Sequence, residues 1–165
     1  MNGVAHTCGD HNHKEIHLSL EYIKQVEPRA KPEISGVITH EVVHCFQYNG
    51  KGTCPSGLIE GIAGPSSPLH IGLMIVPIVQ SDYVRMRADL APPHWNPAKG
   101  EKWDAGYATT AYFLDWLERL RENTVRRLNA LMKDSEYNDT IFNTVAGDNV
   151  HNLWDLYCAQ RDISK

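Results

Sequence analysis

The sequence predicts an α+β protein that is mainly helical and carries a small N-terminal sheet. From Glu15 to Tyr22, apolar and polar residues alternate, which is the pattern of a half-buried strand. Later segments, from about Asp104 to Asn123 and from about Val150 to Ala159, carry apolar residues at helical spacing. A chain of 165 residues with 42% hydrophobic content is expected to form a single domain over residues 1–165.

The segments between these ends are also predicted to be mostly helical. A loop containing Pro28 and Pro32 leads into the next helix, and Asn49 and Gly50 tolerate the left-handed backbone that ends it. The expected elements here are a helix from about Glu33 to Tyr48, a short apolar segment at 58–63, a helix at 82–87 and a short helix through Val125, Leu128 and Leu131.

The first of these helices contains the most informative motif, in which His40, Glu41 and His44 form the pattern HExxH. Two residues four apart lie on the same face of a helix, so both imidazoles can bind one metal ion. Glu41 points about 100° around the helix axis, toward a water on that ion. The alternative is a pair of ordinary histidines, but the apolar flanks make three such polar residues costly without a purpose. The motif is typical of zinc peptidases.

A catalytic zinc ion takes three protein ligands and keeps a fourth position for water, so a third ligand is needed. The arrangement HExxHxxGxxH fails, because Gln47 and Gly50 stand where a glycine and a histidine are required. Glu60 is the better candidate, since it lies 16 residues after His44 and beyond a glycine-containing reversal. The alternative for Glu60 is a surface glutamate in a short helix.

Four segments closely resemble the plant and fungal basic secretory protein family of zincin-like zinc metallopeptidases. They are residues 36–50 (GVITHEVVHCFQYNG), 57–63 (GLIEGIA), 82–85 (DYVR) and 102–107 (KWDAGY). The resemblance covers nearly the whole chain, from about His13 to Tyr157. It implies Zn²⁺ as cofactor, Glu60 as third ligand and a polypeptide substrate. It also implies that a small sheet lies against the HExxH helix, with the edge strand, here Glu15 to Tyr22, lining the substrate cleft.

The resemblance further implies a role for Asp82. Related zincins carry the pattern Glu-Gly-x-Ala-Asp, whose Asp hydrogen-bonds a ligand histidine and fixes its tautomer. Here 18 residues, 64–81, separate Ala63 from Asp82, and we interpret them as an insertion within the motif. Either Asp82 returns by way of a bulged loop, or the site lacks this partner. A second departure is the short segment before the HExxH helix, which suggests a start truncated relative to the family.

The leading hypothesis is therefore a zinc-dependent metallopeptidase that hydrolyses peptide bonds through a zinc-bound water activated by Glu41. Tyr107 either donates a hydrogen bond to the oxyanion or serves packing. One alternative is a catalytically inactive zincin-fold protein that binds zinc or a partner, because the insertion displaces Asp82. Another is a structural zinc domain, which needs four protein ligands.

Charge and hydropathy argue against other classes of function. The net charge is −4 and no basic patch is present, so binding to nucleic acid or to an anionic membrane surface is not expected. The longest apolar run, Leu69 to Val79, contains Pro77 and is too short for a membrane span. Residues 1–8 lack the features of a signal peptide, although the resemblance suggests secretion. The sequence does not indicate an oligomeric state.

Two further features have ordinary structural interpretations. The N-terminal region is rich in residues that bind metals: His6, Cys8, Asp10, His11, His13 and His17. Their spacing fits no familiar ligand pattern, so a polar turn before a strand is expected, with a second metal site as the alternative. Asp104 is expected to cap the helix that follows it. Four cysteines allow three disulfide pairings.

Overall fold

The computed structural model describes residues 3–10, 12–61, 69–71, 74–76, 81–96 and 100–163. These residues form an α+β arrangement of helices with two antiparallel two-stranded sheets. The α-helices are α1 (Leu20–Gln25), α2 (Ala30–His44), α3 (Ser56–Gly61), α4 (Ser81–Arg87), α5 (Tyr107–Leu120), α6 (Thr124–Leu131), α7 (Ile141–Val145) and α8 (Val150–Ile163). The strands are β1 (Ala5–Gly9), β2 (Lys14–Leu18), β3 (Leu69–Ile71) and β4 (Met74–Val76), and the 3-10 helices are η1 (Glu27–Arg29) and η2 (Gly50–Gly52).

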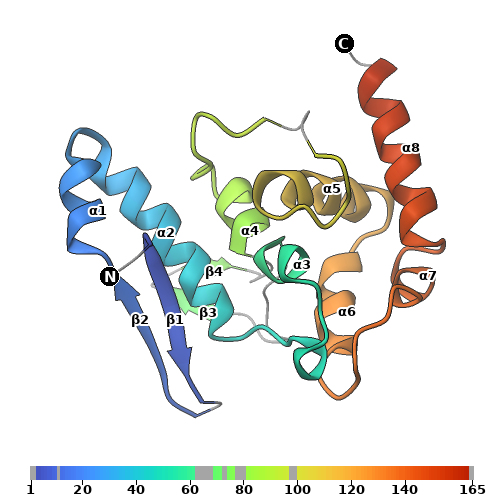
Figure 1. Ribbon diagram of the computed structural model, residues 1–165, viewed down its shortest axis with the longest axis horizontal. Coiled ribbons are helices and arrows are strands. Elements are labelled where there is room, and N and C mark those ends of the chain that lie inside the picture. The colour runs from blue at the N-terminus through green and yellow to red at the C-terminus, as the bar shows by residue number, and fades with distance from the viewer. Residues whose placement is uncertain are drawn as a thin grey trace.

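The β1–β2 hairpin and α2 lie on one side of the molecule, and α5 to α8 lie on the other, with α4 between them (Figure 1). The expected strand at 15–22 is shorter than predicted, because it ends at Leu18 and a helix begins at Leu20. Ser19 explains this end, since its hydroxyl accepts a hydrogen bond from the backbone N–H of Tyr22 and caps α1. The strand is also mostly exposed rather than half-buried.

The helix that carries the HExxH motif begins and ends earlier than predicted. It runs over Ala30–His44, so Pro32 falls within its first turn, where the missing N–H costs nothing. The backbone N–H of Tyr48 donates instead to the side chain of Asn129, at 3.0 Å. This bond to α6 directs the chain away from the axis of α2.

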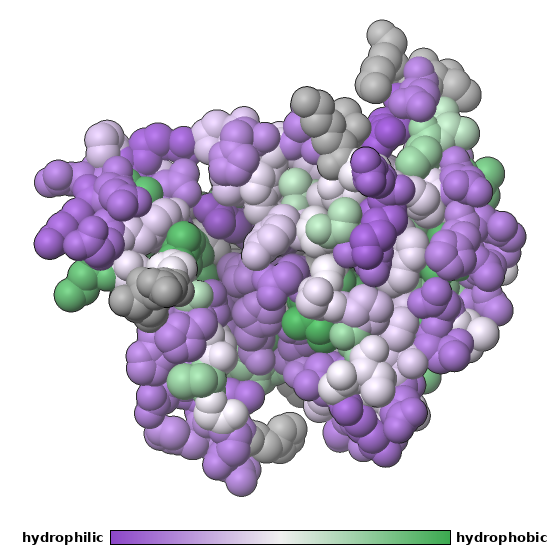
Figure 2. Space-filling model, in the orientation of Figure 1, coloured by the Kyte–Doolittle hydropathy of each residue, from purple (hydrophilic) through white to green (hydrophobic). Residues whose placement is uncertain are grey.

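The main hydrophobic core lies among α5 to α8. Buried Leu114 and Leu117 of α5 confirm the predicted helical spacing, and α8 buries Leu153 and Trp154 in the same core. Leu58 extends this core to α3. On the face drawn in Figure 2, hydrophobic residues show only as small separate patches on a mainly hydrophilic surface.

The start of α5 differs from the prediction. The helix begins at Tyr107, and Gly106 stands at its N-cap position, so Asp104 does not cap it. Thr110 replaces that cap: its hydroxyl accepts from the N–H of Gly106 at 3.0 Å and donates to the carbonyl of Trp103 at 2.9 Å. Asp104 pairs with Lys102 instead.

The segment 64–81 is described only in part. Strands β3 and β4 form an antiparallel pair within it, Ser81 begins α4, and the remaining residues lie outside the described ranges. Helix α4 then packs against α2 at a point where Gly36 carries no side chain. A Cβ on Gly36 would lie 2.5 Å from Nε of Arg85, so glycine permits this close approach.

The described residues also show the state of the cysteines and the character of the helices. All four cysteines are free thiols, so none of the three possible pairings is formed. Within the described part of the chain, the helices are too short or too polar to cross a membrane.

Gly57 generates a prediction about the placement of α3. A Cβ at this position would collide with the carbonyl oxygen of Asp104, so α3 approaches the loop before α5 closely. Gly57→Ala is expected to destabilise the protein by about 1–3 kcal/mol, since a backbone atom cannot move aside as a side chain can. Urea unfolding measures this. The control Ser56→Ala changes an exposed neighbour, and equal stability of the two variants would contradict the close approach.

Candidate metal centre

The three predicted ligands lie together at one place. His40 and His44 come from α2, and Glu60 comes from α3. The Nε2 atoms of the two histidines are 3.0 Å apart. Glu60 Oε2 is 3.2 Å from Nε2 of His40 and 3.8 Å from Nε2 of His44. They line a cleft of about 910 Å³, so a substrate has access to them.

The tautomer of His44 is set by a residue that the sequence analysis did not identify. Gln47 donates from Nε2 to the backbone carbonyl of Ile59 at 2.7 Å, which leaves its Oε1 as an acceptor. His44 Nδ1 lies 2.8 Å from this Oε1 and must carry the hydrogen. The Nε2 of His44 therefore presents a lone pair to Glu60 and His40.

His40 is oriented in the same way by Asp82. Its Nδ1 donates to Asp82 Oδ1 at 2.9 Å, and the Asp82 side chain is only 2% exposed. The expectation that the insertion displaces Asp82 is therefore not met. Arg85 of α4 explains this position, because its Nη2 donates to Glu33 of α2 at 3.1 Å and holds the two helices together.

These hydrogen bonds bring three acceptor atoms to one point with no hydrogen between them. Without a cation, the site takes up a proton: burial lowers the pKa of His40, but the hydrogen bonds to Asp82 and Glu60 outweigh it and raise the pKa to about 9. The hydrogen bond from His40 in turn lowers the pKa of Glu60, against the effect of burial. Two imidazoles and a carboxylate are a donor set that zinc prefers, so the residues present fit this ion.

Glu41 lies beside this group and is held by the hairpin. It is 5% exposed, and it lines the same cleft. Thr7 of β1 donates from its hydroxyl to Glu41 Oε2 at 2.7 Å, and the same hydroxyl lies 2.9 Å from the Glu41 carbonyl oxygen. This contact fixes the carboxylate and leaves Oε1 available to a proton. Thr7 is the second contributor that the sequence analysis missed, because β1 was not predicted.

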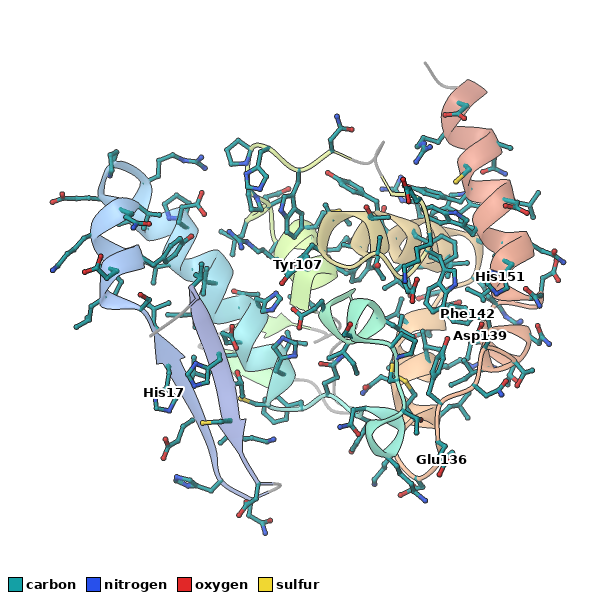
Figure 3. All side chains as sticks on the ribbon, viewed as in Figure 1. His17, Tyr107, Glu136, Asp139, Phe142 and His151 are labelled. Atoms are coloured by element: carbon teal, nitrogen blue, oxygen red, sulfur yellow. The ribbon has the colours of Figure 1, made fainter. Side chains whose placement is uncertain are left out.

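Tyr107 stands at the rim of the cleft, at the first residue of α5 (Figure 3). It is 60% exposed and has a positive φ of 44°. The negative charge of Glu60, then burial and the charge of Asp82, raise the pKa of its hydroxyl. The hydroxyl therefore stays protonated at neutral pH and is able to donate a hydrogen bond into the cleft.

The comparisons with known proteins identify one family. A family model described as "Peptidase of plants and bacteria", abbreviated BSP, matches residues 1–64 and 72–157. The break at 65–71 falls within the segment interpreted as an insertion. Neither a curated protein nor a solved structure matches the chain.

The raised pKa of His40 predicts how the stability of the metal-free protein depends on pH. The folded-state pKa of about 9 exceeds the ordinary 6.5, so the protonated ring stabilises the fold fully below pH 6.5. This contribution, on the order of 3 kcal/mol, is lost as the pH rises through 9. Urea unfolding of EDTA-treated protein across this range measures it. In Asp82→Asn the loss should be smaller, and a wild-type stability that stays constant would contradict the assignment.

The contact of Gln47 with His44 predicts that replacing Gln47 lowers the affinity for zinc even though all three proposed ligands remain. Gln47→Leu removes the acceptor that orients His44, so zinc binding should weaken about 10 to 100-fold. Competition with a chromogenic chelator measures the affinity. Gln25→Leu, at an exposed site in α1, is the matched control and should bind zinc as wild type does. Unchanged affinity in Gln47→Leu would show that the His44 tautomer does not depend on Gln47.

Proposed function

The chain belongs to the BSP family of peptidases, and from this membership and the geometry above we propose that it is a zinc metallopeptidase of zincin-like fold. The observation that carries the proposal is the convergence of Nε2 of His40, Nε2 of His44 and a carboxylate oxygen of Glu60. A cation at this point would be held by all three. Bound there, Zn²⁺ would act as a Lewis acid and lower the pKa of a water molecule toward 7.

Residues of the chain would then transfer a proton from the attacking water to the leaving amine. Glu41 Oε1 accepts a proton from the water that attacks the scissile carbonyl, and passes it to the nitrogen of the leaving amine. Thr7 keeps Oε2 occupied and so holds the carboxylate in one orientation during both transfers. Tyr107 is the proposed donor to the oxyanion, since its protonated hydroxyl stands at the rim of the cleft.

The substrate of a peptidase is a polypeptide, and the cleft suggests where it binds. Residues 3–7, which include the first part of β1, line the cleft, whereas β2 contributes only its first residue, Lys14. Among the described residues, β1 pairs with β2 alone, so its second edge is free for strand pairing. We therefore propose that an extended substrate pairs with β1 rather than with the strand expected from the sequence.

The alternative functions have less support. The inactive zincin was suggested because the insertion would displace Asp82, yet Asp82 contacts His40. A structural zinc site takes four protein ligands, whereas the group described here contains three, His40, His44 and Glu60. Three ligands favour a catalytic arrangement, which leaves a position for water.

The experiment that tests the proposal separates chemistry from metal binding. Glu41→Gln keeps the size of the side chain but cannot accept a proton, so turnover of casein should fall by about 10² to 10⁴ while zinc content persists. Glu60→Ala should lose zinc and activity together. Glu21→Gln, at an exposed site in α1, is the control for the charge change. Equal turnover in wild type and Glu41→Gln would refute the peptidase mechanism.

A further inference from the structure

The hairpin has a second face, opposite the one from which Thr7 contacts Glu41, and His6 on this face also borders the cleft. Side chains alternate along a strand, so His6 and Cys8 of β1 lie on the face opposite Thr7. In the β1–β2 register, His17 stands directly opposite His6, and Glu15 stands directly opposite Cys8. One exposed face of the hairpin therefore carries two imidazoles, a thiol and a carboxylate, and Figure 3 labels one of them, His17.

The distances on this face suit one metal ion. The rings of His6 and His17 are stacked, with centroids 4.8 Å apart and planes within 3° of parallel. One ligand atom from each of His6, Cys8 and His17 lies within 4.8 Å of the other two. In a tetrahedral zinc site with bonds of about 2.0–2.3 Å, ligand atoms lie roughly 3.3–3.8 Å apart. Stacked rings direct their nitrogen lone pairs in parallel, so one imidazole must rotate out of the stack before both can bind one ion, and the exposure of these side chains leaves room for that rotation.

We propose that this face is a second zinc site, with His6, Cys8 and His17 as ligands and Glu15 as the fourth. Glu15 Oε2 lies 3.1 Å from Nε2 of His17, close to the separation of neighbouring ligands in such a shell. Imidazole and thiolate favour zinc over magnesium or calcium, which prefer oxygen ligands. Four protein ligands make this site closed, so it serves structure rather than catalysis.

A zinc ion at this site would stabilise the pairing of β1 with β2. A two-stranded hairpin is marginally stable in water by itself. A cation bound between His6 and Cys8 on β1 and His17 on β2 links the two strands. Because Thr7 contacts Glu41 from the opposite face of β1, the ion also steadies the strand that orients the proposed catalytic base.

Cobalt substitution tests this site separately from the peptidase centre. Metal-free protein, kept reduced, is titrated with Co²⁺, and thiolate coordination gives a charge-transfer absorption in the near ultraviolet. Among the described residues, the other group that could hold a metal ion, His40, His44 and Glu60, contains no sulfur, so the band reports on the hairpin site. We expect the band in wild type and its loss in Cys8→Ser. The matched control Cys158→Ser, on α8, should keep it.

Zinc content provides the second measurement. After gel filtration, wild type should hold about two zinc ions per chain, and both Cys8→Ser and His17→Gln about one. His44→Ala should keep the charge-transfer band, so failure at the peptidase centre and failure at the hairpin are distinguishable. The proposal is overturned if wild type shows no band, if Cys8→Ser keeps it, if zinc content is equal in wild type and both hairpin variants, or if zinc binds the hairpin more weakly than about 100 µM.

Discussion

Two hydrogen bonds on the outer nitrogens of His40 and His44 determine the chemistry of the whole site. Asp82 holds Nδ1 of one ring and Gln47 holds Nδ1 of the other, so both Nε2 lone pairs face Glu60. Three acceptors that meet at one point repel one another unless a cation or a proton joins them. Zinc binding at this site, as we propose it, would therefore release the proton that His40 holds when the metal is absent.

Packing between helices, rather than continuity of the chain, places the partners of these histidines. Asp82 reaches His40 although 18 residues separate it from Ala63, because α4 is fixed to α2 by the ion pair of Arg85 with Glu33. Gly36 permits that approach. The 18 residues between Ala63 and Asp82 thus interrupt the motif in sequence while the contact between Asp82 and His40 is kept in space. The position of the carboxylate beside His40 therefore depends on the packing of α4 against α2, and less on which residue directly follows α3 in the sequence.

Contacts within one helix could be predicted from the sequence, whereas most contacts between distant segments could not. Helical geometry fixes residues four apart, so the pairing of His40 with His44 followed from spacing alone, and the glycine-containing reversal suggested Glu60. The role of Gln47 could not be predicted, because it depends on where α2 ends, which involves Asn129 in α6. His6 and Cys8 resembled a polar turn, since their alternation has meaning only once β1 pairs with β2. The α+β class was correct, whereas strand ends and caps depended on Ser19 and Thr110.

We propose that zinc binds at the Nε2 atoms of both histidines and at Glu60, and anomalous diffraction at the zinc edge, from crystals of the zinc-loaded protein, would locate the ion. We expect a peak about 2.0–2.1 Å from Nε2 of His40 and of His44, and about 2.0–2.2 Å from a carboxylate oxygen of Glu60. Zinc bound through Nδ1 of either histidine, or no zinc between these three side chains, would contradict it.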